Sequence, residues 1–343
     1  MRAVIHIGTE KTGSSSLQAY LCSGAGELAV AGVHCCTSAG DGNNRALVTA
    51  FMDLEESDDY TRLHGLDDTE TRAAWRAAYL EAFEAEVAAC TADLFVISSE
   101  HFHSRLLAPA QVAALAAFLR PLFDDIQVRV YLRRQDELAL SFYSQKLRAG
   151  FIPPTILPLA NVRRSPRTPP PYFDFQALLE RWADAFGEAA VYPCLYDRSL
   201  LQGGEVVSDF CHFAALPLLD VVLPSPVNTA LSAPAQAALL RFNECCGGDR
   251  ESRERHRPTR NALAAYLQAH GAGRSVLPAR AEAEEFYAAF AAGNAAVARR
   301  WFGREQLFNE DFSRYPEAPA PVDWERAAAL LAGFAAGQSS PAC

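Results

Sequence analysis

The stretch that decides the fold lies at the N-terminus and reads Ala3-Val4-Ile5-His6-Ile7-Gly8-Thr9-Glu10-Lys11-Thr12-Gly13-Ser14-Ser15-Ser16-Leu17. Its first five residues are mostly apolar and predict a buried strand, and the residues from Ser14 to Leu21 carry their apolar side chains at helical spacing. A loop between a strand and a helix directs backbone N–H groups and the positive end of the helix dipole toward an anion. Gly8 and Gly13 permit a positive φ, and serines 14 to 16 add hydroxyl donors. We therefore expect an anion-binding loop here.

Strands and helices alternate over the first 200 residues. Further strands are expected at residues 94–97, 126–132 and 190–195, and helices at 110–119 and 175–186. Strands separated by helices predict an α/β fold with three layers, in which helices cover both faces of a central parallel sheet. We expect one P-loop-like domain over residues 1–317, followed by an Ala- and Pro-rich segment over residues 318–343.

Two stretches interrupt this pattern. Residues 153–171 contain seven prolines, and Arg163, Arg164 and Arg167 lie among them. Because proline lacks an N–H donor and disrupts helices, we expect neither a helix nor a central strand there, but an insert or a lid. Residues 247–260 are dense in charges of both signs and predict a solvated loop.

The composition limits the class of protein. Half of the 343 residues are apolar and the formal net charge is −10, which disfavours non-specific binding to nucleic acid. The nine cysteines form no C-x-x-C pair, as expected of reduced thiols, and no Cys/His cluster has the spacing of metal ligands. No apolar run reaches the roughly 20 residues of a membrane span. We therefore expect a cytoplasmic enzyme without a metal, which binds anions at a local site.

The loop is not a Walker A motif, because Lys11 precedes Gly13 instead of following it. It resembles the 5′-phosphosulfate loop of sulfotransferases that use 3′-phosphoadenosine 5′-phosphosulfate (PAPS), whose usual form is Pro-Lys-(Ser/Thr)-Gly-Thr-Thr. Lys11 matches the lysine of that family, and Thr12-Gly13-Ser14-Ser15 matches the residues that follow it. Glu10 replaces the usual proline.

A second motif follows the strand at residues 126–132. An arginine at a strand end and a serine eight residues later can converge on one anion, and Arg133 and Ser141 have this spacing. The pair resembles the 3′-phosphate motif of the same family, with Glu137 where the family often has Asp. Arg134 is the alternative arginine if the match to the motif is displaced by one residue. The other alternative is that the two arginines form a salt bridge at the end of a helix and bind no anion.

The strand at residues 190–195 leads to Tyr196. This residue matches the family's tyrosine that lies against the adenine, and stacking of a base on its ring is chemically reasonable. A buried core tyrosine is the alternative role.

The candidate base follows the strand at residues 94–97, in Ser98-Ser99-Glu100-His101. Ligands of open parallel sheets bind beyond the carboxyl ends of the strands, so both Glu100 and His101 are placed for acid–base chemistry. Glu100 is favoured because Ser-Ser-Glu resembles the bacterial members of the family. His101 is the second candidate, since its ordinary pKa suits a base at neutral pH. A helix-capping Glu100 without a chemical role is a third reading.

The resemblance implies a bacterial carbohydrate-type sulfotransferase. Such an enzyme transfers a sulfuryl group from PAPS to a hydroxyl or amine of a small molecule, glycan or glycolipid and releases 3′-phosphoadenosine 5′-phosphate (PAP), with Lys11 in the role of a metal. The three arginines of the proline-rich stretch would then face an anionic glycan. A nucleotide-dependent kinase and a catalytically silent PAP-binding protein remain the alternatives.

Overall fold

The computed structural model of the chain describes residues 1–40, 42–164, 170–221 and 231–338. It contains two compact units, each assembled from three separate segments of the chain. The first unit comprises Met1–Arg133, Pro171–Ser225 and Ala292–Phe308, and the second comprises Arg134–Pro170, Pro226–Ala291 and Asn309–Cys343.

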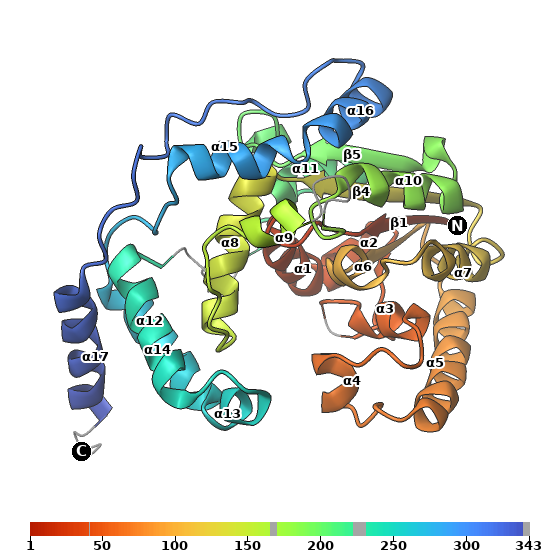
Figure 1. Cartoon of the computed structure of the whole chain (residues 1–343). Coiled ribbons are helices and arrows are strands. Elements are labelled where there is room, and N and C mark those ends of the chain that lie inside the picture. The colour runs from red at the N-terminus through yellow and green to blue at the C-terminus, as the bar shows by residue number, and fades with distance from the viewer. Residues whose placement is uncertain (41, 165–169, 222–230, 339–343) are drawn as a thin grey trace. The chain divides into compact units, whose positions relative to one another are not determined.

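The first unit is built on a sheet of five parallel strands (Figure 1). The strands are β1 (Arg2–His6), β2 (Val33–Cys35), β3 (Leu94–Ser98), β4 (Asp125–Leu132) and β5 (Val191–Leu195), in the spatial order β2-β3-β1-β4-β5. After β1 the chain continues toward β2, whereas after β4 it continues toward β5. The crevice where these directions diverge, at the carboxyl ends of β1 and β4, is the usual ligand site of such sheets.

Helices and two 3₁₀ turns surround this sheet. They are α1 (Ser14–Ser23), α2 (Ala25–Val30), α3 (Arg45–Phe51), α4 (Asp59–Leu63), α5 (Thr69–Ala89), α6 (His101–Arg105), α7 (Pro109–Leu119), α10 (Phe175–Phe186), η1 (Glu188–Ala190), η2 (Gln202–Gly204), α11 (Val206–Ala214) and α16 (Ala291–Phe302).

Apolar side chains on both faces of the sheet hold the layers together. On one face, Val4 and Val96 share a buried cluster with residues of α1 and α11. On the other face, the ring of Phe95 lies 5.9 Å from that of Phe83 in α5, which in turn lies 5.8 Å from Phe118 in α7. Alternate residues of a strand point to opposite faces, so continuous apolar runs are what a doubly covered parallel sheet requires. The predicted α/β class with a central parallel sheet flanked by helices is confirmed.

The second unit is helical over the residues that the structure describes. Its helices are α8 (Gln135–Arg148), α9 (Leu159–Arg164), α12 (Ala233–Cys246), α13 (Arg250–Arg255), α14 (Arg257–His270), α15 (Arg280–Ala288) and α17 (Trp324–Gln338). Helix α12 packs against α8, α14 and α17, and Leu147, Leu239, Leu267 and Leu330 contribute to their common core.

Two expectations about local structure were wrong. Residues 159–164 form the short helix α9, because the prolines lie on either side of this segment and Leu159 and Val162 bury their side chains. The stretch at residues 247–260 contains α13 and the start of α14 in place of a loop. Its opposite charges lie one helical turn apart, as in the ion pair of Glu251 and Arg255, and such pairs support a helix. Arg167 lies outside the described residues.

Candidate functional site

The loop after β1 has the backbone of an anion-binding loop. Gly8, Lys11 and Gly13 have φ values of 84°, 66° and 83°. A Cβ at Gly8 would lie 3.0 Å from Cα and Cβ of Glu100, and one at Gly13 would lie 2.7 Å from a methyl carbon of Val206. The chain therefore requires glycine at both positions, for conformation as well as for space. A left-handed lysine is unusual, and such strain is frequent at functional sites.

Hydrogen-bond donors gather at the start of α1. Gly13 is the N-cap residue, and no side chain caps the helix. The Ser14 side chain is buried, and its hydroxyl has no hydrogen-bond partner among the residues described. Ser15 and Ser16 are exposed. The Ser16 amide donates a 3.0 Å hydrogen bond to the carbonyl oxygen of Gly13. The amides of Ser14 and Ser15 and these hydroxyls are thus the donors available to an anion at the helix N-terminus.

Two neighbours of Lys11 have their polar groups engaged within the protein. The Thr12 hydroxyl donates a 2.6 Å hydrogen bond to the carbonyl oxygen of Thr9, so Thr12 stabilises the loop through its side chain. Glu10 is buried and accepts a 2.9 Å hydrogen bond from the Tyr172 hydroxyl. Burial alone would raise the pKa of Glu10, but the Ser104 hydroxyl, His103, His101 and the Tyr172 hydroxyl outweigh it and lower this pKa below its ordinary value.

Arg133, Tyr196 and Lys11 lie together at the carboxyl ends of three strands. Nη1 of Arg133, directly after β4, donates a 3.1 Å hydrogen bond to the carbonyl oxygen of Lys11. Cζ of Arg133 lies 5.7 Å from the centre of the Tyr196 ring, and this ring lies 3.5 Å from the place of a Cβ at Gly13. The anion loop thus has an arginine and an aromatic face beside it.

Arg134 has a structural role in the second unit. Its guanidinium forms two hydrogen bonds to the buried Asp136 carboxylate, of 2.8 and 2.9 Å, and two more to the carbonyl oxygens of Asn309 and Asp311. The ring of Phe312 stacks against it at 4.5 Å. These interactions occupy the guanidinium of Arg134. Arg133 is therefore the better candidate for the arginine that binds an anion in the second motif.

The remaining part of the second motif lies on α8. Ser141 is half-buried there, and Glu137 forms an ion pair of 2.7 Å with Arg314. Since Arg133 belongs to the first unit and Ser141 to the second, their convergence on one anion stays a prediction.

Glu100 follows β3, and amide side chains bind its carboxylate. Nε2 of Gln18 in α1 donates a 2.7 Å hydrogen bond to Oε2, and Nδ2 of Asn43 lies 3.3 Å from both carboxylate oxygens. Oδ1 of Asn43 accepts a 2.6 Å hydrogen bond from the Ser99 hydroxyl, which fixes the orientation of this amide. Because Glu100 also lies against Gly8, its carboxylate is positioned next to the anion loop.

His101 is a weaker candidate for the base. Its Nε2 lies 3.9 Å from Oε1 of Glu100, and burial together with the positive charges of Arg45 and Arg105 lowers its pKa to about 3. A base of such low proton affinity is poorly matched to catalysis near neutral pH. The low pKa therefore weakens the case for His101 as the base.

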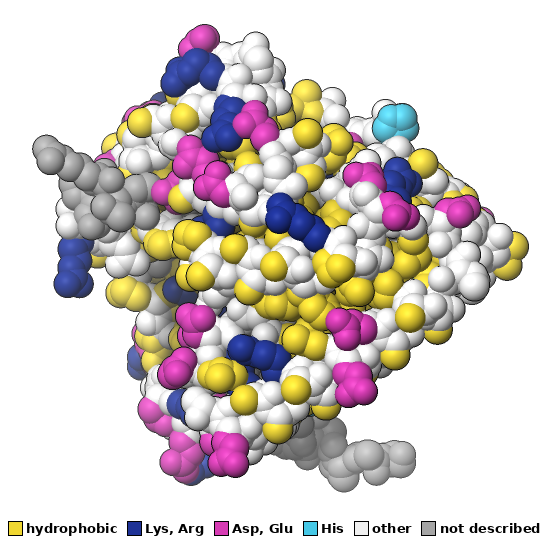
Figure 2. Space-filling model, turned by 90° about the vertical axis from the view of Figure 1, so that its right-hand side faces the viewer, with side chains coloured by type: hydrophobic (Ala, Val, Ile, Leu, Met, Phe, Trp, Pro, Cys, Tyr) yellow, Lys and Arg dark blue, Asp and Glu magenta, His cyan; other side chains and the backbone are white. Residues whose placement is uncertain are grey.

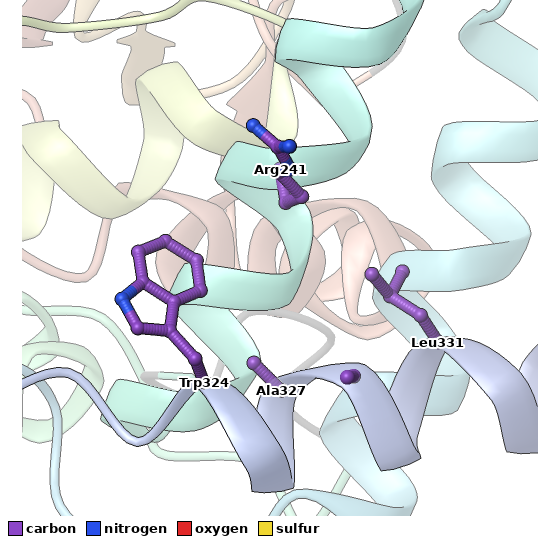
Figure 3. A pocket seen from close by; sticks show the side chains of 5 residues that line it. Arg241, Trp324, Ala327 and Leu331 are labelled. Atoms are coloured by element: carbon purple, nitrogen blue, oxygen red, sulfur yellow. The ribbon is translucent and has the colours of Figure 1, made fainter.

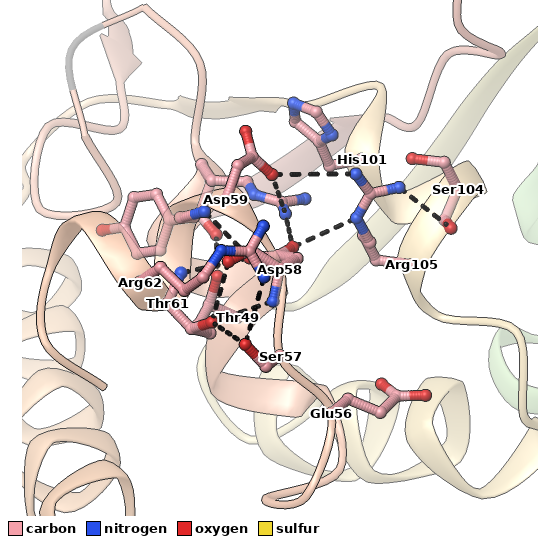
Figure 4. A network of polar contacts seen from close by, with 12 residues as sticks. Thr49, Glu56, Ser57, Asp58, Asp59, Thr61, Arg62, His101, Ser104 and Arg105 are labelled. Atoms are coloured by element: carbon pink, nitrogen blue, oxygen red, sulfur yellow. Dashed lines mark hydrogen bonds and ion pairs between the residues drawn. The ribbon is translucent and has the colours of Figure 1, made fainter. Parts of the chain in front are cut away.

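A network of ion pairs lies beside His101, among the helices α3, α4 and α6 (Figure 4). Asp58 caps α4 and forms ion pairs with Arg45 at the start of α3 and with Arg105 at the end of α6, the latter at 3.1 Å. Asp59 lies 3.7 Å from Arg45 and 3.9 Å from Arg105. The network thereby connects three short helices around His101.

Sequence reasoning missed the residues that position Glu100. Gln18 directly follows the quoted N-terminal stretch, four residues after Ser14, so its presence near the loop could have been inferred. Asn43 and the charged network carry no such signal, because their partners are distant along the chain.

Charges are mixed over the face of the molecule shown in Figure 2, where acidic and basic side chains are interspersed with hydrophobic ones. Attraction for an anion on this acidic chain must therefore come from a local site. Within the described ranges, no group of three or more His, Cys, Asp or Glu side chains could hold a metal ion. In the same part of the chain, no helix is long and apolar enough to cross a membrane.

Comparisons with known proteins do not identify a family for this chain. No family model matches the chain. An uncharacterized protein of Archaeoglobus fulgidus is 31% identical over 120 residues, which span 33% of this chain and 29% of that protein. A crystal structure of a sulfotransferase from Alicyclobacillus acidocaldarius aligns with 73% of this chain and 98% of its own, at 14% identity and a TM-score of 0.38. A structural likeness of this size carries no conclusion about function.

Proposed function

We propose that this protein is a sulfotransferase, which moves the sulfuryl group of PAPS to a hydroxyl or amine of an acceptor, with a carbohydrate or glycolipid as the expected class. One observation carries the proposal. Arg133 and Tyr196 lie at the Lys11 loop, and Glu100 lies against Gly8 of the same loop. An anion cradle, a second cation, an aromatic face and a carboxylate base are the groups that this transfer requires.

The donor side of the proposal assigns each group to a part of the nucleotide. The amides of α1, serines 14 to 16 and Lys11 bind the 5′-phosphosulfate end. Arg133 binds the 3′-phosphate and Tyr196 stacks on the base, whereas a contribution of Ser141 to the phosphate site stays a prediction. The orphaned Ser14 hydroxyl and the uncapped N-terminus of α1 fit a bound anion, because both are donors that the folded chain leaves available.

PAPS supplies the sulfuryl group in this reaction. Glu100 takes the proton of the acceptor hydroxyl or amine while the acceptor atom forms its bond to sulfur. The bond between sulfur and the phosphate oxygen breaks, and PAP leaves with the electron pair. Lys11 and the first-turn amides of α1 stabilise the charge that develops on the leaving oxygen, so we propose no role for a metal.

Lysine is rare in this chain, which contains only Lys11 and Lys146. A lysine ammonium is a compact point charge, whereas arginine presents a planar fork. The use of lysine at position 11, in a chain that otherwise relies on arginine, supports a role for a small cation in this loop.

Fewer observations bear on the residues that would bind the acceptor. Arg163 of the proline-rich segment is bound through two hydrogen bonds of 2.7 Å by Glu285, so its guanidinium is engaged within the second unit. The role of this segment as a lid stays a prediction, and Arg167 lies outside the described residues. The cytoplasmic location stays a prediction.

The experiment that tests the proposal measures PAP release from PAPS in the presence of a panel of glycans and glycolipids. We expect turnover that falls about 10²- to 10³-fold in Lys11→Ala, because the variant lacks the charge at the leaving oxygen. Lys146→Ala, which removes the other lysine from its place on the Phe142 ring, should keep wild-type turnover. Tight PAP binding without turnover on any acceptor would favour the silent binding protein, and phosphate transfer from ATP would favour the kinase.

A further inference from the structure

The second unit contains a groove of about 610 Å³ between α12 and the segment that leads into α17. Its walls are largely apolar and include Leu240, Val276, Val322 and Trp324. Val322 is 46% exposed and Trp324 is 52% exposed, so large hydrophobic surface stands open to solvent at this groove. Open apolar surface of this kind often marks a binding site.

The charged residues that line this groove are all arginines: Arg274, Arg280 and Arg314. Such a lining is unusual in a chain with a net charge of −10. Two of these arginines have acidic partners outside the lining, since Arg280 pairs with Glu317 at 2.5 Å and Arg314 pairs with Glu137 at 2.7 Å. Arg274 is exposed, and within the described ranges its guanidinium has no hydrogen-bond or ion-pair partner.

Arg280 adds a further open donor. Its Nη2 donates a 3.2 Å hydrogen bond to the carbonyl oxygen of Tyr315, but its Nε is buried and has no partner among the described residues. A buried donor without an acceptor is costly, and an anion near it would remove that cost. The polar end of the groove is thus complementary to a negative group.

A second hollow of about 390 Å³ adjoins the same tryptophan (Figure 3). Trp324 lines both hollows, and Ala327 and Leu331 of α17 extend the apolar lining of the smaller one. Arg241, which pairs with Glu244 at 3.1 Å, also lines the smaller hollow, and its other lining residues are apolar. Apolar surface therefore continues along α17, which suits an extended ligand better than a compact one.

We propose that this groove binds a single-chain amphipathic anion, with its negative head at Arg274 and Arg280 and its apolar chain along Trp324. The apolar walls provide burial of the chain, and the unpaired arginine selects against neutral and cationic heads. The proposal concerns the second unit alone and does not depend on the donor site.

Calorimetric titration of the full chain with dodecanoate, below the concentration at which it forms micelles, tests the proposal. We expect saturable binding that is at least about tenfold weaker for dodecanol and for dodecyltrimethylammonium. Arg274→Glu should weaken dodecanoate binding by a similar factor, whereas Arg257→Glu, an exposed arginine of the same unit, should leave it unchanged. Equal affinity for the three amphiphiles, or no binding of dodecanoate, would overturn the proposal.

A fluorescence experiment locates the chain of the ligand. Bromine quenches tryptophan at contact, so 11-bromoundecanoate should quench part of the emission of the four tryptophans, and Trp324→Phe should abolish that quenching while dodecanoate still binds. Unchanged quenching in Trp324→Phe would place the ligand elsewhere. No nucleotide is present in either experiment, so the results are independent of the proposed transferase activity.

Discussion

The side-chain amide of Gln18 donates a 2.7 Å hydrogen bond to Oε2 of Glu100 and so links the first helix after the anion loop to the end of β3. The loop and the carboxylate are thereby fixed relative to each other, since Gln18 lies on the helix that the loop begins. Asn43 holds the same carboxylate from a third segment of the chain. In the proposed reaction these two amides are positioning residues.

Replacing Gln18 by leucine should lower kcat by about ten- to a hundredfold, because a misplaced base loses much of its effect. The KM for PAPS should change little, since the side chain of Gln18 binds Glu100 and is not among the residues proposed to bind PAPS. Gln127→Leu is the matched control, as Gln127 bonds Asp125 near the opposite end of β4. A rise in the KM for PAPS with an unchanged kcat would show that Gln18 acts on the donor instead.

The identity of the base can be assigned by comparing Glu100→Gln with His101→Ala. We expect Glu100→Gln to lower kcat by about 10²- to 10⁴-fold, because it removes the proton acceptor and keeps the shape of the side chain. His101→Ala should retain most activity, since the low pKa of about 3 makes this histidine a poor base. Single-turnover rates measured on both variants provide the comparison, and the opposite ranking would assign the proton transfer to His101.

Acidification should destabilise the protein through its buried histidines. Burial lowers the pKa of His6 and His101 to about 3 and that of His103 to about 4, from an ordinary value of 6.5, and nearby arginines add to this effect at His6 and His101. Between pH 6.5 and about 4 the unfolded chain therefore binds protons that the folded chain does not, so stability falls as the pH falls. Each histidine contributes on the order of 2 kcal/mol of destabilisation at pH 5.

The melting temperature between pH 5 and 8 measures this effect. It should fall below pH 6.5 in the wild type and fall less steeply in His6→Asn, which keeps a polar group near the Ser98 hydroxyl. His64→Asn, at an exposed histidine of the same unit, should follow the wild type. Identical slopes in all three proteins would contradict the assignment of His6 as a neutral, buried histidine.

Much of the first unit could be predicted from the sequence because local patterns define it. The apolar runs at residues 3–7 and 94–97 have the length and composition of buried strands, and a helix follows each polar turn. Parallel strands place their carboxyl ends at one edge of the sheet. Lys11, Glu100 and Arg133 each lie within five residues of the end of such a strand, which is enough to group them.

Other features depend on contacts between distant parts of the chain. The choice between Arg133 and Arg134 rests on Asp136, Asn309 and Asp311, which bind Arg134. Helix α9 forms in a proline-rich stretch because Leu159 and Val162 find a core to pack in. The assembly of each unit from three segments is likewise a matter of tertiary contacts, which periodicity does not reveal.

Calorimetric titration with PAP, with 5′-AMP and magnesium–ATP as comparison ligands, tests the central claim most directly. We predict tight binding that requires the 3′-phosphate and weakens at least about tenfold in Arg133→Ala, which loses charge-assisted hydrogen bonds to that group. Arg300→Ala, which removes an exposed arginine paired with Glu188 in the same unit, should bind PAP like the wild type. Failure to bind PAP, or a preference for magnesium–ATP that Arg133→Ala leaves intact, would contradict a PAPS site at this loop.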